Sequence, residues 1–150
     1  MSVRRPPGRV LGIDLGQRRI GLAISDPDRR VATPDRVIAR TRDAERDRRA
    51  IAAVADEWEA SLVVVGLPLS LDGSDGPAAV AARAEATRIG EVTGRPVETY
   101  DERFTTVTAE RTLAEQDVRG QDRRKVVDMV AAAVLLQAWL DRRTPQDLTP

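Results

Sequence analysis

The run Leu62-Val63-Val64-Val65 constrains the fold more than any other segment of the chain. Four successive apolar residues, three of them β-branched, are typical of a strand buried on both faces, because a half-buried strand alternates apolar with polar side chains. Helical patterns precede and follow this run, from Asp43 and over about 77–92. We therefore expect residues 62–65 to form a central strand that is parallel to a neighbour and lies between helices.

The remaining segments complete a mixed sheet of five strands. The other strands are expected at residues 10–14, 20–25, 31–39 and 96–100. The first two of these form a hairpin, and the third continues it as a meander. Further helices are expected over about 106–116 and 122–141. Three antiparallel strands followed by alternating helix and strand predict an α/β fold with helices on both faces of a five-stranded sheet.

The length of 150 residues fits a single domain, 1–150, in which about 1–8 and 142–150 are expected to be flexible ends. The longest apolar run, Met129 to Leu136, is much shorter than the ~20 residues that span a bilayer. The basic N-terminus is not followed by a signal-like apolar stretch. These features predict a soluble, cytoplasmic protein with no membrane partner.

The chain contains no histidine and no cysteine, which removes whole classes of chemistry. Imidazole bases, thiol nucleophiles, zinc sites of the usual ligand types and Ser-His-Asp triads are all excluded. Any catalysis therefore falls to carboxylates. Because 24 basic residues balance 24 acidic ones, a nucleic-acid partner would have to be held by local basic patches and not by the net charge.

Asp14 is the first candidate acid, in the motif Gly-Ile-Asp-Leu-Gly at residues 12–16. Side-chain alternation places it on the face of Val10 and opposite Leu11. A carboxylate in a partly buried strand is costly unless a cation, a hydrogen-bond donor or a metal offsets its charge. The alternative is an aspartate that only stabilises the hairpin turn.

Two adjacent acids, Asp101 and Glu102, close the fifth strand and point to opposite sides. Only one of them can share a site with Asp14. The alternative is a solvated strand end with an ion pair to Arg103. The loop over residues 66–73 follows the carboxyl end of the central strand, where open sheets bind ligands, although it could equally be a plain surface loop.

Asp128 lies in the last helix on a face shared with Ala131, Ala132, Leu135 and Trp139. An acid on a core-facing stripe suggests a functional role, unless the dipole of the first helical turns is what favours it. Basic residues near the three acids could neutralise phosphates, or could form an ordinary solvated face. The candidates for phosphate contacts are Arg18, Arg19, Arg103, Arg123, Arg124 and Lys125.

The three acids belong to elements that this topology brings together. Oxygen-only ligands suit Mg²⁺ or Mn²⁺, and paired ions can activate water and stabilise the leaving oxygen of a phosphodiester. We therefore expect Asp14, Asp128 and one of the two acids that close the fifth strand to be the catalytic residues and metal ligands.

Four blocks of the chain together resemble the RuvX-like (YqgF) family of pre-16S rRNA nucleases, formerly described as Holliday junction resolvases. The blocks are Gly-Ile-Asp-Leu-Gly at 12–16, Gly-Leu-Pro-Leu at 66–69, Asp-Glu-Arg-Phe-Thr-Thr at 101–106 and Val-Asp-Met-Val-Ala-Ala at 127–132. The resemblance implies a ribonuclease-H-like fold, a divalent metal, cytoplasmic residence and processing of the 5′ end of pre-16S rRNA. Carried over position by position, it implies Asp14, Glu102 and Asp128 as the catalytic residues and metal ligands, with Asp101 as a further metal ligand.

Three other functions are alternatives to this nuclease. A Holliday junction resolvase would use the same acids on branched DNA. A non-catalytic nucleic-acid-binding module would keep the fold without the reaction, and the presence of all three acids argues against it. A sugar-kinase or actin-like ATPase would need a second lobe and a second phosphate loop, which 150 residues do not supply. Monomer and homodimer are both compatible with the sequence.

Overall fold

The structure, a computed structural model, describes residues 5–70, 72–105 and 121–142, without the side chains of Phe104 and of residues 121–126. Its strands are β1 (Val10–Leu15), β2 (Arg19–Ser25), β3 (Ala32–Ala39), β4 (Leu62–Leu67) and β5 (Val97–Asp101). Its helices are α1 (Ala44–Glu57), α2 (Pro77–Thr93), a short 3-10 helix η1 (Glu102–Phe104) and α4 (Gln121–Asp141). The helix expected over 106–116 lies outside the described residues, as do most of the expected flexible ends.

The five strands form one mixed sheet in the order β3-β2-β1-β4-β5. The meander β1-β2-β3 is antiparallel, whereas β4 is parallel to both β1 and β5. Every residue of β4 is buried, so the continuous apolar run is an interior parallel strand, as its sequence predicted, although β1 is the middle strand of the sheet. The α/β fold with a five-stranded mixed sheet is thereby confirmed.

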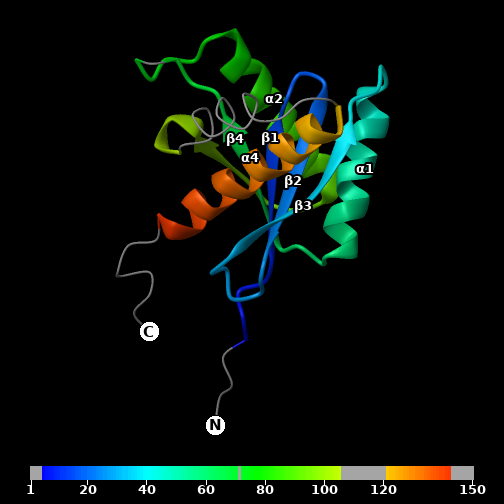
Figure 1. Ribbon diagram of the computed structural model, residues 1–150, viewed down its shortest axis with the longest axis vertical. Helices are drawn as coiled ribbons and strands as arrows, with labels where there is room; N and C mark the ends of the chain where they lie inside the picture. The colour runs from blue at the N-terminus through cyan, green and yellow to red at the C-terminus, as the bar shows by residue number, and fades with distance from the viewer. Residues whose placement is uncertain (1–4, 71, 106–120, 143–150) are drawn as a thin grey trace.

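The two faces of the sheet bury separate cores. Leu11 and Ile13 of β1 belong to a cluster with Ile51 of α1 and Ile89 of α2. On the opposite face, Val10 of β1, Ala23 of β2 and Val64 of β4 pack on α4 in a second cluster. Figure 1 shows α4 lying across one face of the sheet, with α1 and α2 on the other side. Leu11 and Val10 lie in different clusters, as the alternation predicted, and side-chain alternation in β1 places Asp14 on the Val10 face, which packs on α4.

Glycines on the α4 face allow the helix to approach the strand backbone. A Cβ atom added at Gly12 would lie 2.8 Å from Cβ of Leu136, and one added at Gly21 would collide with the backbone oxygen of Asp128. Real Cβ atoms cannot approach their neighbours so closely without a shift of the backbone. The depth at which α4 sits on β1 and β2 therefore depends on these two positions having no side chain.

We expect Gly21→Ala to lower the free energy of unfolding by about 1–3 kcal/mol, the usual cost of overpacking, because the rigid helix backbone blocks the added methyl group. Denaturant unfolding measures the loss. Gly94→Ala is the matched control: among the described residues a Cβ there meets nothing within 4 Å, so its expected cost is that of the left-handed backbone at φ +66. A loss at Gly21 no larger than that at Gly94 would contradict the close approach of α4.

Candidate active site

Asp14 is 2% exposed and lies beneath α4. In the β1–β2 ladder it is the direct partner of Gly21, the position at which Asp128 of α4 crosses the sheet. The absence of a side chain at Gly21 therefore brings the backbone of Asp128 over the strand pair that carries Asp14. The hairpin and the last helix, more than 100 residues apart, meet at this point.

Glu102 reaches the same face of the sheet from the end of β5. It is the first residue of η1, and Asp101, as the N-cap of that short helix, accepts a hydrogen bond from the backbone N–H of Arg103 at 2.9 Å. The Glu102 carboxylate lies over Gly66 of β4: a Cβ there would be 2.8 Å from its Oε1 atom. Because Val65 pairs with Ile13, Gly66 is level with the end of β1 that carries Asp14.

Asp14 and Glu102 line one cavity of about 540 Å³ at the carboxyl ends of β1 and β4. Its other walls come from the β1–β2 hairpin, the loop after β4 and the first turns of α2. The remaining lining residues are Leu15, Gly16, Gln17, Arg40, Gly66, Pro68, Ala78, Ala81, Ala82 and Glu85. A cavity at the carboxyl edge of parallel strands is the usual ligand position in an open α/β sheet.

Asp128 stands at the edge of this arrangement. Its side chain is 17% exposed, and its Oδ2 atom lies 3.8 Å from Nη1 of Arg19. It does not line the cavity of Asp14 and Glu102. Within the described ranges there is no group of three or more acidic side chains placed to hold a metal ion. The structure thus brings two of the three expected acids into one cavity and places the third beside it.

Asp101 and Arg103 form a tight ion pair with each other. Arg103 donates from Nη2 to Oδ2 of Asp101 at 2.6 Å and from Nε to both carboxylate oxygens. The hydrogen bonds from Arg103 hold the pKa of Asp101 below its ordinary value and raise the pKa of Arg103. Neither residue lines the cavity, and the guanidinium packs against Gly73 of the loop after β4. In this structure the pair joins that loop to the end of β5.

The basic residues expected to contact phosphates have different surroundings in the structure. Arg18 is exposed near the tip of the β1–β2 hairpin, and Arg19 faces Asp128. The side chains of Arg123, Arg124 and Lys125 lie outside the described residues. Sequence reasoning missed Arg40, which lines the cavity. The register could have indicated it, because Ala39 pairs with Arg19 and so places the end of β3 beside the hairpin.

The family model of RuvX, described as Holliday junction resolvase, matches residues 8–142. The chain belongs to the RuvX family. An Anaeromyxobacter protein (strain Fw109-5), named as a pre-16S rRNA nuclease, is 50% identical over 135 residues, which cover 90% of this chain and 98% of that protein. A Myxococcus xanthus relative of the same name is 46% identical, covering 93% of this chain and 91% of its own length.

Two solved structures share the fold of this RuvX family member. Thermus thermophilus RuvC in complex with a Holliday junction substrate has a TM-score of 0.57 at 16% identity, over 89% of this chain and 93% of that chain. A further Thermus thermophilus RuvC structure has a TM-score of 0.52, also at 16% identity, over 88% and 93%. These likenesses support the ribonuclease-H-like fold. No helix in the described part of the chain is both long and apolar enough to cross a membrane.

We expect Gly66→Ala to damage the site more than the fold. The added methyl would press on Oε1 of Glu102 and on Leu135, and the flexible Glu102 side chain would be the one to move away. Cleavage of labelled nucleic acid should fall at least about tenfold, because misplacement of a reacting group by ~1 Å can cost a hundredfold. Gly76→Ala should retain activity, because within the described residues its Cβ would meet only Ser70 within 4 Å. Equal activity of both variants would contradict a catalytic position for Glu102.

Proposed function

We propose that this RuvX protein is a metal-dependent endonuclease that processes the 5′ end of pre-16S rRNA in the cytoplasm. The observation that carries the proposal is the shared cavity of Asp14 and Glu102 at the carboxyl edge of the sheet. The names of relatives that match nearly the whole chain supply the substrate. The same acids argue against a module that only binds nucleic acid.

The residues present suit a hard divalent cation. A chain without histidine and cysteine can offer oxygen ligands, and Mg²⁺ and Mn²⁺ accept carboxylate oxygens. Asp14 is almost fully buried, and its carboxylate and that of Glu102 line the same cavity, so both could supply oxygen ligands to one ion. We therefore assign Asp14 and Glu102 as metal ligands. Asp128 is the third carboxylate of the proposed site, and in this structure it forms an ion pair with Arg19.

The reaction follows from what these side chains can do. A divalent ion at such a site lowers the pKa of bound water and stabilises charge on a phosphodiester. Asp14 on β1 and Glu102 just after β5 would hold the ion from either side of β4, and Asp14 is almost fully buried on the face of the sheet that packs on α4. The Asp101–Arg103 pair acts indirectly, because it holds the turn from which Glu102 projects.

The description of the family model favours a second candidate, resolution of Holliday junctions. Branched DNA would use the same acids, so the chemistry of the site does not separate the two substrates. The likeness to RuvC at 16% identity concerns the fold alone. The choice of rRNA rests on the much more similar relatives.

Asp14→Asn should abolish cleavage and leave the metal-free protein as stable as the parent or slightly more so, because the amide keeps the shape and removes a buried negative charge. It should also reduce the rise in melting temperature that Mn²⁺ gives the parent, since that rise reports binding to the native state. Melting curves with and without Mn²⁺ test both points. Asp28→Asn, in the exposed β2–β3 turn, is the control and should keep the full response. Reduced stability with an unchanged Mn²⁺ response would make Asp14 a structural residue.

Activity should require Mg²⁺ or Mn²⁺, whereas Ca²⁺ should bind and support cleavage poorly, because its looser geometry positions the attacking water less well. The assay compares a labelled pre-16S rRNA leader transcript with a four-way DNA junction, each with Mg²⁺, Mn²⁺, Ca²⁺ and excess chelator. We expect metal-dependent cleavage of the transcript. Undiminished cleavage in chelator would contradict the metal site. Cleavage of the DNA junction without cleavage of the transcript would show that the substrate is branched DNA and not rRNA.

A further inference from the structure

Charged side chains enter the cavity from several walls. Asp14 and Glu102 form its acidic side, and Glu85 enters from α2. Arg48 neutralises Glu85: its Nε and Nη2 atoms donate to the two carboxylate oxygens at 2.8 and 2.9 Å, and these bonds raise the pKa of the guanidinium. Among the described residues that line the cavity, Arg40 is the only cation. A ligand at the two acids therefore has one basic side chain in the same cavity.

The structure holds Arg40 firmly in place. Its backbone N–H donates to the oxygen of Arg18 at 2.9 Å, and its Nε donates to the oxygen of Gly16 at 2.6 Å. The next residue, Thr41, donates from its backbone N–H and its hydroxyl to the buried Asp47, at 3.0 and 2.8 Å. The Arg40 guanidinium is thus anchored to the β1–β2 hairpin, and the backbone that follows it is tied through Thr41 to the start of α1.

The outer edge of the Arg40 guanidinium has no partner in the described part of the chain. Only Nε is engaged, and no carboxylate there pairs with Nη1 or Nη2. The planar donor fork of arginine matches two oxygens of one phosphate, and a fork that is already oriented loses less entropy on binding. Arg40 lies in the same cavity as Asp14 and Glu102, so its guanidinium could bind a phosphate next to the scissile phosphate at the two acids.

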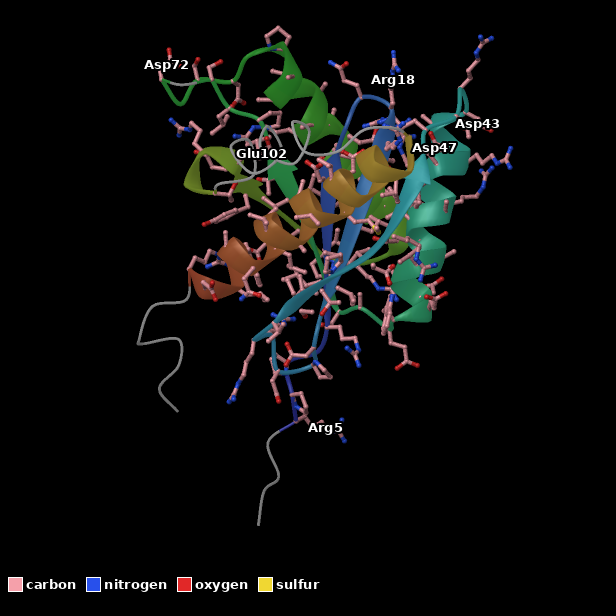
Figure 2. The ribbon with its side chains drawn as sticks, in the orientation of Figure 1. Arg5, Arg18, Asp43, Asp47, Asp72 and Glu102 are labelled. Atoms are coloured by element: carbon pink, nitrogen blue, oxygen red, sulfur yellow. The ribbon has the colours of Figure 1, made fainter. Side chains whose placement is uncertain are left out.

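Further arginines continue this positive charge outside the cavity. Arg18, Arg42 and Arg46, here called the basic rim, are exposed and have no ion pair within the described residues. The nearby Asp43 instead caps α1 by accepting from the backbone N–H of Arg46 at 3.1 Å. Figure 2 shows Arg18, Asp43 and Asp47 at the same end of the molecule as Glu102, with Arg5 at the opposite end.

We propose that Arg40 binds a non-scissile phosphate of the nucleic-acid strand and that the strand leaves the cavity over the basic rim. This inference rests on the proposed nuclease function and adds the path of the substrate to it. A chain of zero net charge needs such a local surface to hold a polyanion. Arg40 acts by binding and positioning the strand, while Asp14 and Glu102 act at the reacting phosphate.

The test measures binding apart from cleavage. Fluorescence anisotropy of the labelled pre-16S rRNA leader transcript, in chelator and over a series of salt concentrations, compares the parent with Arg40→Gln and Arg30→Gln. Arg30 is exposed in the β2–β3 turn, at the other end of β2. We expect Arg40→Gln to weaken binding about tenfold and to reduce the salt slope by about 0.7–0.9, the value for one lost phosphate contact. Arg30→Gln should stay within about twofold of the parent.

Arg40→Lys separates the donor fork from the charge. It should keep the salt slope and still weaken binding, because lysine offers a point charge where the phosphate meets two parallel donors. A melting curve for each variant identifies any loss of folding; if Arg40→Gln does not fold, the lysine variant decides. Binding by the folded Arg40 variants that equals the parent's in affinity and salt slope would overturn the role of Arg40.

The double variant Arg42→Gln/Arg46→Gln tests the path of the strand. The slope of its log affinity against log salt concentration should become shallower by up to the amount expected for about two lost phosphate contacts. An unchanged slope would overturn the path over the basic rim. The two proposals fail in different ways. A parent that binds the transcript and never cleaves it contradicts the nuclease, whereas a parent that cleaves while Arg40→Gln binds unchanged contradicts only this inference.

Discussion

The close contact between α4 and the glycine positions of the sheet is the constraint on which the rest of the structure depends. Gly12 and Gly21 let the helix approach the backbone of β1 and β2, and Gly66 leaves room for Glu102 and Leu135 on the same face. With a side chain at Gly12 or Gly21, α4 would have to move outwards. The burial of Asp14, the position of Asp128 and the approach of Glu102 over β4 all follow from this one packing arrangement.

Electrostatics then divides the charged groups between structure and chemistry. Several carboxylates serve the fold: Asp47 ties β3 to α1, Glu85 holds Arg48, and Asp101 holds Arg103. The cavity that contains Asp14 and Glu102 carries its cation separately, on the hairpin side. This separation of acids from the arginine fork is what a site for a metal and a phosphate chain requires.

Much of this arrangement could be predicted from the sequence, because it depends on local periodicity. The strand run at 62–65 and the alternation around Asp14 indicated the sheet and its faces. The engagement of Asp101 by Arg103 was foreseen only as an alternative, and Arg40 was missed, because each depends on how a side chain turns once distant segments have packed. The pairing of Asp128 with Arg19 is also such a tertiary contact.

We propose that α4 and the sheet create one metal centre around Asp14 and Glu102. Crystals of the protein grown with Mn²⁺ test it most directly, through the anomalous scattering of the ion. The account predicts a peak within coordination distance, roughly 2.1 Å, of carboxylate oxygens of both residues, with Asp128 turned from Arg19 towards the ion. Mn²⁺ found only at outer acids such as Asp72, in a protein that still cleaves RNA, would contradict it.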